Sequence, residues 1–163
     1  MAAEQADFRE AMSRLGAGVC VLASDGPAGR CALTVSAVCS VTDAPPTLLA
    51  CVNRRSSLEP VFRANGAIAV NVLAPGQEGL ALPFAGAGAL PMEARMALAE
   101  WDLLPNGMPG LRGAAASLGG RIAETIERGT HSMFVIELEE VALGAAEGGL
   151  IWLGRRCHAV GAP

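Results

Sequence analysis

The sequence predicts a mainly β protein, a small closed antiparallel β-barrel with a few helices at its periphery. Short apolar, β-branched runs recur along the chain, and Gly- and Pro-rich turn signals separate them. Helical periodicity is confined to a few short segments, which argues against a helical or doubly wound fold. At 163 residues, the chain is expected to form one domain over residues 1–163 with a substantial core.

The first expected element is an amphipathic helix, because Phe8, Met12 and Leu15 recur at helical spacing and Asp7 precedes them as a cap. Strands are expected at 19–24, 31–42, 47–53, 67–73 and 150–153, and as two long strands within 114–141 that join at 128–130. Shorter helices are expected at 57–65, 77–84 and 92–99, with a flexible loop at 85–89. Ser56 and Glu59 have capping-box spacing, and the residues after 153 read as a polar tail.

Composition narrows the class of partner. The net charge is −4, which argues against nucleic acid or an anionic membrane as the main ligand. Hydrophobic residues make up 52% and charged residues only 17%, so apolar surface is expected to be buried against another copy of the chain. No apolar run approaches the roughly 20 residues of a membrane-spanning helix, and the opening residues lack signal-peptide features, so a cytoplasmic protein is expected.

Several catalytic classes are excluded by missing residues. All 12 cationic side chains are arginine, so Schiff-base chemistry and a P-loop lysine are absent, and the chain has no tyrosine. No dinucleotide-binding glycine fingerprint occurs. The five cysteines form no C-x-x-C pair and are expected to be buried free thiols. With only His131 and His158 available, no metal site is expected.

The most informative stretch is residues 34–57, TVSAVCSVTDAPPTLLACVNRRSS. Thr34 and Ser36 are two apart, so on a strand their hydroxyls face one side, followed by the backbone amides and small groups of Ala37 and Val38. The alternative is that these are ordinary strand residues. The second strand ends in a cationic, hydroxyl-rich corner that suits a phosphate group, formed by Asn53, Arg54, Arg55 and Ser56. The alternative here is a solvated basic turn.

Other polar residues have plainer interpretations. His131 follows a Gly-Thr turn and begins a strand, where a lone histidine is commonly a hydrogen-bonded structural residue. Glu137, Glu139 and Glu140 are expected on the wet face of that strand. Arg156 and His158 belong either to a basic rim or to a solvated C-terminal tail.

The chain resembles the short flavin reductase family, the reductase partners of two-component flavin-dependent monooxygenases. The resemblance is densest over 34–57 and extends nearly end to end. It includes Phe8-Arg9-Glu10-Ala11-Met12, Asp25-Gly26-Pro27-Ala28-Gly29-Arg30, Val70-Asn71-Val72-Leu73, Met92-Glu93-Ala94-Arg95, Gly129-Thr130-His131, Gly149-Leu150-Ile151-Trp152 and Arg156-Cys157-His158. It implies an FMN-binding split barrel of the Greek-key antiparallel type and a homodimer with flavin near the subunit boundary.

The resemblance also implies roles for individual residues. Thr34, Ser36 and Ala37 would line the flavin ring, and Asn53, Arg54, Arg55 and Ser56 would hold the ribityl chain and phosphate. Phe84 would lie at the edge of the pocket. His131 matches the family's Gly-x-His element and would contact the nicotinamide nucleotide as the catalytic-site histidine, with Arg156 and His158 at its phosphates.

The implied activity is NAD(P)H:flavin oxidoreductase. FMN or FAD would be reduced by NADH or NADPH, and the reduced flavin would pass to a separate monooxygenase. Two alternatives use the same scaffold: a flavoprotein that reduces a dedicated acceptor such as a corrinoid, and a non-catalytic flavin-binding protein.

Overall fold

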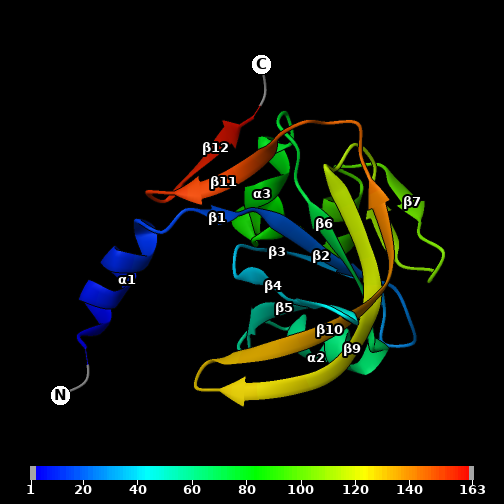
Figure 1. The fold of residues 1–163 in the computed structure, drawn as a ribbon, viewed down its shortest axis with the longest axis horizontal. Coiled ribbons are helices and arrows are strands. Elements are labelled where there is room, and N and C mark those ends of the chain that lie inside the picture. Colours follow the sequence, from blue (N-terminus) through cyan, green and yellow to red (C-terminus); the bar gives the residue numbers. More distant parts are fainter. Residues whose placement is uncertain (1–2, 162–163) are drawn as a thin grey trace.

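The fold is a curled antiparallel sheet that carries most of the chain (Figure 1). It is described from a computed structural model, which covers residues 3–161. The seven strands run in the order β3-β2-β6-β9-β10-β5-β4, and every neighbouring pair is antiparallel. The sheet curls far enough for β3 and β5 to lie against each other, which closes the barrel. The strands are β2 (Cys20–Ser24), β3 (Cys31–Val35), β4 (Val38–Asp43), β5 (Pro46–Asn53), β6 (Ala67–Val72), β9 (Ala116–Arg128) and β10 (His131–Leu143).

Two smaller sheets lie beside the barrel. One has the order β1-β11-β12, from β1 (Ala17–Gly18), β11 (Gly149–Leu153) and β12 (Arg156–Val160), and the other pairs β7 (Trp101–Leu103) with β8 (Pro109–Leu111). The expectation of a polar tail after residue 153 is therefore wrong, because β12 pairs with β11 along its full length. Its sequence, Arg-Cys-His-Ala-Val, is mostly exposed and lacks the apolar signal of a buried strand.

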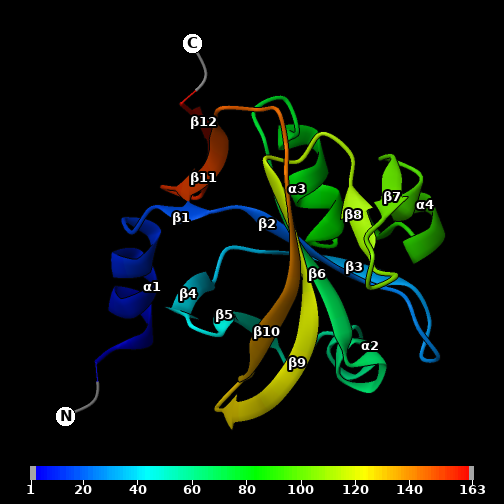
Figure 2. The same ribbon diagram turned by 45° about the vertical axis from the view of Figure 1, so that its right-hand side comes forward.

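Short helices cover the barrel at separate places (Figure 2). They are α2 (Glu59–Asn65), α3 (Glu78–Phe84), α4 (Met92–Met96) and the 3-10 turn η1 (Ala87–Ala89). Helix α3 packs on β2, β3 and β12, whereas α2 packs on β6. Helix α4 ends three residues before the predicted 99, and residues 87–89, expected as flexible loop, form η1. Among residues 3–161, no helix has the length and apolar character needed to cross a membrane.

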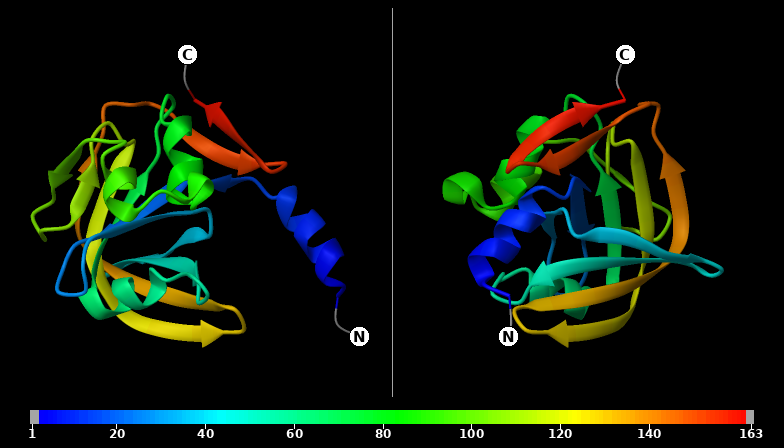
Figure 3. Two further views of the ribbon diagram at one scale, coloured as in Figure 1. Left: turned by 180° about the vertical axis from the view of Figure 1, so that it is seen from behind. Right: turned by 60° about the vertical axis from the view of Figure 1, so that its left-hand side comes forward.

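Helix α1 (Gln5–Ser13) stands away from the barrel (Figure 3). Its N-cap is Glu4, whose side chain makes no capping bond, so the expected cap at Asp7 is wrong. None of its residues is buried: Phe8 and Met12 are 58% and 45% exposed, and Leu15, two residues after its end, is 61% exposed. Toward the C-terminal end of the helix, Gly154 N donates to Ser13 O at 2.7 Å and Arg155 pairs with Glu10 at 3.1 Å.

The barrel interior holds the main core. In β5 the alternate residues Leu48, Ala50 and Val52 point inward, as period-2 alternation requires. They pack with Phe62 and Phe134, which are fully buried. A second buried cluster fills the space between α3 and the barrel wall. The two faces of β5 therefore differ, since the side opposite the core remains free to line a site.

The start of α2 differs from the expected capping box. Glu59 does not cap the helix; its side chain is only 8% exposed and accepts hydrogen bonds from Ser132 and Arg63. Ser56 instead accepts from Leu58 N at 3.2 Å. Burial alone would raise the pKa of Glu59, but the bonds from Ser132 and Arg63 outweigh it and hold that pKa below its ordinary value.

Candidate functional site

A cavity of about 520 Å³ opens where three segments of the barrel meet α3. The segments are the end of β3 with the turn after it, the end of β5 with its following loop, and the first residue of β10. The lining residues are Leu33, Thr34, Val35, Ser36, Ala37, Cys51, Val52, Asn53, Arg55, Ser56, Ala85 and His131. The volume is in the usual range for a small-molecule site.

One wall of the cavity is made of small side chains. Ala37 and Ser36 lie on the β3–β4 turn, and Ala85 lies opposite at the end of α3. Thr34 Oγ1 donates to Ala81 O at 2.7 Å, so its proton is committed to α3 and its oxygen remains an acceptor. A flat ring can approach backbone closely at such a wall, where a larger side chain would block it.

A second cavity of about 180 Å³ adjoins this wall. It shares Thr34, Ser36 and Ala85 with the first cavity and adds Leu82 and Trp152. Trp152 comes from β11, so the small sheet that carries the C-terminal strand borders the site. The two cavities are therefore neighbours, and the smaller one extends toward Trp152.

The other end of the site is polar and cationic. Arg55 and Ser56 lie in the loop after β5, and Asn53 holds the shape of this loop with two hydrogen bonds. Its side-chain Oδ1 accepts from Arg55 N at 2.9 Å, and its backbone oxygen accepts from Ser56 N at 2.9 Å. Among residues 3–161, no carboxylate pairs with the Arg55 guanidinium. A free, exposed guanidinium beside a hydroxyl is suited to bidentate binding of phosphate.

Arg54 takes a different direction from its neighbour. It does not line the cavity; its Nη2 pairs with Glu127 at 2.8 Å, and its Nη1 donates to Gly129 O at 3.4 Å. Of the two arginines expected at one phosphate, only Arg55 is among the residues that line the cavity. Arg54 and Arg55 are the two central residues of the turn that Ser56 N closes onto Asn53 O, and their side chains leave this turn in different directions: Arg54 reaches the β9–β10 hairpin, whereas Arg55 lines the cavity.

His131 lies at the rim of the same cavity, opposite Asn53 in the β5–β10 pairing. Its Nδ1 is 2.9 Å from Thr130 Oγ1, a contact that orients the ring. The hydroxyl can donate to or accept from Nδ1, according to the tautomer. His131 is thus both hydrogen-bonded and exposed, with the rest of its ring available to a ligand.

Besides Arg54, four expected site residues lie outside the lining. Val38 begins β4 and packs half-buried against the barrel core. Phe84 is fully buried, with its ring edge-on to Trp101 at 5.8 Å, so its side chain is in the core and the next residue lines the cavity instead. Arg156 and His158 lie on β12, and His158 Nε2 contacts Leu153 O at 3.1 Å.

Several lining residues were not anticipated. Cys51 could have been found, because it shares a strand face with Asn53 two residues on. Burial raises the pKa of the Cys51 thiol, with a smaller contribution from Cys39. Ala85 belongs to a Gly/Ala-rich segment with no chemical signal, and only the packing of α3 against β3 brings it to the cavity.

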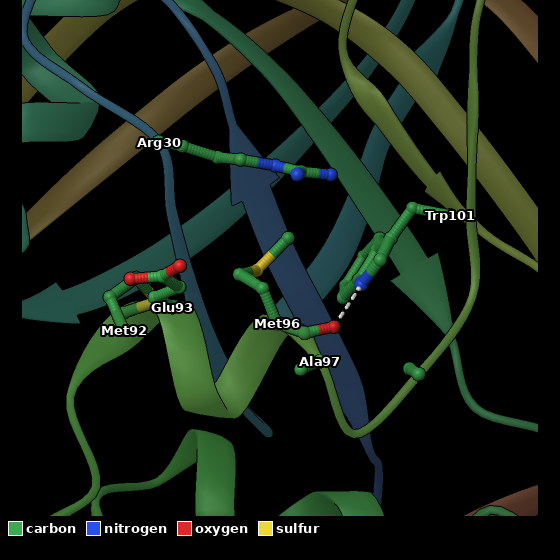
Figure 4. Close-up of a pocket in the computed structure, with 7 residues that line it drawn as sticks. Arg30, Met92, Glu93, Met96, Ala97 and Trp101 are labelled. Carbon is green, nitrogen blue, oxygen red and sulfur yellow. Dashed lines mark hydrogen bonds between the residues drawn. The ribbon is translucent and has the colours of Figure 1, made fainter.

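A larger cavity of about 590 Å³ lies elsewhere, between α4 and β7 (Figure 4). Its floor includes Met96 and Trp101, joined by a hydrogen bond from Trp101 Nε1 to Met96 O at 2.9 Å. Arg30 and Glu93 stand at its rim with opposite charges, so the carboxylate would oppose a phosphate there. The two cavities share no lining residue. Within residues 3–161, no three His, Cys, Asp or Glu side chains gather to hold a metal ion.

Known proteins are similar to this chain over nearly its whole length. The family model described as flavin reductase like domain matches residues 12–161. The 4-hydroxyphenylacetate 3-monooxygenase reductase component of Pseudomonas aeruginosa is 49% identical over 159 residues, covering 98% of this chain and 94% of the relative. The FMN reductase (NADH) RutF of Cronobacter sakazakii is 47% identical over 160 residues, covering 98% and 95%.

Solved structures are similar in fold as well. The NADH:FAD oxidoreductase SgcE6 of Streptomyces globisporus, in complex with NAD and FAD fragments, has a TM-score of 0.85 and 27% identity, covering 95% of this chain and 92% of that one. The flavin reductase component BorF of a bacterial two-component tryptophan halogenase has a TM-score of 0.89 at 24% identity, covering 98% and 100%, and supports the fold alone. The expected split-barrel architecture is thereby confirmed.

Proposed function

The chain belongs to the flavin reductase-like family, and from that premise we propose that it uses NADH to reduce FMN. The observation that carries the proposal is the 520 Å³ cavity, with a wall of small side chains at one end and the free Arg55 beside Ser56 at the other. The names of the relatives, FMN reductase (NADH), support the choice of flavin and nucleotide. The active unit is the single flavin reductase-like domain formed by residues 1–163.

The lining fits a flavin in size and chemistry. Ser36, Ala37 and Ala85 leave room for a flat ring, and Thr34 offers an acceptor oxygen at its edge. Asn53 and Ser56 border the path toward Arg55, which would hold the phosphate. Bound flavin supplies N5 as the acceptor of a hydride from C4 of the nicotinamide. The side chains bind, orient and exclude water, because the hydride transfer requires ring geometry and no acid or base.

The experiment is a steady-state assay at 340 nm with purified protein. NADH or NADPH is supplied together with FMN, FAD or riboflavin. We expect NADH oxidation that depends on added FMN and is fastest with that pair. A yellow preparation without NADH oxidation would make the protein a flavin carrier and overturn the proposal.

We propose that reduced FMN leaves and is used by a separate monooxygenase in the cytoplasm. The similarity to monooxygenase reductase components supports this destination, and the open, solvent-facing phosphate end of the cavity supports release. When the protein loaded with FMN is mixed with NADH and filtered rapidly, reduced flavin should appear in the flow-through. Flavin that stays bound through many turnovers would indicate a dedicated acceptor such as a corrinoid.

We also propose a homodimer that uses α1. This helix presents Phe8 and Met12 to solvent on one face, and Leu15, two residues after its end, is also exposed. Among the described residues, its hydrogen bond at Ser13 and its ion pair at Glu10 go to Gly154 and Arg155, between β11 and β12. Such an uncovered apolar face is typical of a subunit interface. Sedimentation equilibrium should give twice the mass of 16.6 kDa, and Phe8→Asp with Met12→Asp should give the monomer mass. An unchanged dimer in the double variant would place the interface elsewhere.

A further inference from the structure

We propose that Arg54 is a positioning residue for His131, and through it for the nicotinamide nucleotide, rather than a ligand of the flavin phosphate. This inference rests on the proposed function, because it divides two adjacent arginines between two substrates. Arg55 faces the cavity, whereas Arg54 faces the β9–β10 hairpin. Together, the contacts of Arg54 with Glu127, Gly129 and Thr130 form a turn clamp.

The turn clamp joins the end of β5 to the hairpin by three contacts. The side chain pairs with Glu127 at 2.8 Å and donates to Gly129 O at 3.4 Å, and the backbone Arg54 N donates to Thr130 O at 2.9 Å. The hairpin turn consists of Gly129 and Thr130 only, and Gly129 has φ +55°. Because the turn is only two residues long, a displacement of Gly129 also displaces His131, which directly follows the turn.

Glu127 is itself held from the other side. Arg63 donates to Glu127 at 2.9 Å and to Glu59 at 2.6 Å, and Glu59 also accepts the Ser132 hydroxyl at 2.5 Å. Ser132 is fully buried beside His131 in β10. The carboxylate that receives Arg54 is therefore anchored to α2 and to the strand that carries His131. A side chain with a fixed partner holds a turn in place; one with a mobile partner does not.

The same contacts make Arg54 unsuitable as a phosphate ligand. Its guanidinium already pairs with one carboxylate and one carbonyl, and a phosphate bound there would lie beside the negative charge of Glu127. Arg55 has no such competitor among the described residues and lines the cavity directly. Two neighbouring arginines of the same charge thus have different tasks, which the sequence Asn-Arg-Arg-Ser alone does not distinguish.

The experiment compares Arg54→Ala with its neighbour Arg55→Ala as the matched control, and Arg54→Lys as the conservative rescue. Removing the Arg54 side chain should raise the KM for NADH about threefold to tenfold while leaving the FMN dissociation constant within about twofold. The control variant Arg55→Ala should instead raise the FMN dissociation constant and leave the KM for NADH nearly unchanged. Lysine keeps a cation for Glu127, so Arg54→Lys should recover most of the NADH KM. Circular dichroism will show whether Arg54→Ala is folded; if it is not, Arg54→Lys can be compared with the wild type in its place.

An NMR signal read without substrates tests the geometry independently. The chain has only two histidines, so the Cε1 proton of His131 is assigned by its loss in His131→Gln. In Arg54→Ala this signal should shift and sharpen as the turn loosens, while the His158 signal stays in place. A rise in the FMN dissociation constant equal to that of Arg55→Ala, with an unmoved His131 signal, would overturn the proposal. Failure of the wild-type protein to oxidise NADH with FMN would instead refute the proposed function.

Discussion

Removing the Arg55 side chain should weaken FMN binding through its phosphate and through nothing else. In the structure Arg55 lines the cavity without a carboxylate partner among the described residues, so its guanidinium is available to a phosphate. A hydrogen-bonded charge pair contributes about 1.5–3 kcal/mol, and the solvent exposure of Arg55 favours the lower end of that range. Arg55→Ala should therefore raise the FMN dissociation constant about 10- to 30-fold.

Riboflavin makes the assay selective, because it has the same ring without the phosphate. Quenching of flavin fluorescence gives both dissociation constants, and riboflavin binding should differ by less than about twofold between wild type and variant. Raising the salt concentration should weaken FMN binding to the wild type and have little effect in Arg55→Ala, because salt screens exposed charges. Equal loss of FMN and riboflavin affinity would show that Arg55 shapes the cavity rather than binding phosphate.

Three further changes have expected outcomes. Ala37→Leu should fill the ring end of the cavity and raise the FMN dissociation constant about 5- to 150-fold with the melting temperature nearly unchanged; normal FMN affinity would move the ring elsewhere. Phe84→Ala should lower the free energy of unfolding in urea by about 3–5 kcal/mol because the ring is fully buried, and a loss below about 1 kcal/mol would contradict a core position. Because the pKa of Glu59 lies below its usual 4.5 when folded, the ionised group stabilises the fold above that pH and loses this contribution as the pH falls through the lower folded value. The stability advantage of the wild type over Glu59→Gln in urea should therefore shrink as the pH falls below about 4.5; an advantage that grows in acid would reverse the sign assigned to Glu59.

Local patterns in the sequence predicted much of the fold correctly. The β9–β10 hairpin, with its turn at Gly129, and the alternation of β5 were readable because period-2 burial leaves a strong apolar signal. The strand β12 was missed because it pairs at an exposed edge and buries little. The capping box at Ser56 was misread because Glu59 turns inward to Ser132, a residue 73 positions away along the chain.

The candidate site was predictable where neighbours in sequence are neighbours in space. Seven expected residues do line one cavity: Thr34, Ser36, Ala37, Asn53, Arg55, Ser56 and His131. Their roles toward flavin and nucleotide stay predictions. Arg54 could not be separated from Arg55 by sequence, because its partner Glu127 lies on a distant strand. The end of α3 directs the Phe84 side chain into the core and the Ala85 side chain to the cavity, and the sequence alone does not show these directions.

We propose that one cavity, bounded by the β3–β4 turn and the loop after β5, holds the flavin. A crystal structure of the protein soaked with FMN would test this placement. The flavin ring should lie against Ala37 and Ala85, with the phosphate on Arg55. Flavin density between Met96 and Trp101, in the larger cavity, would contradict it.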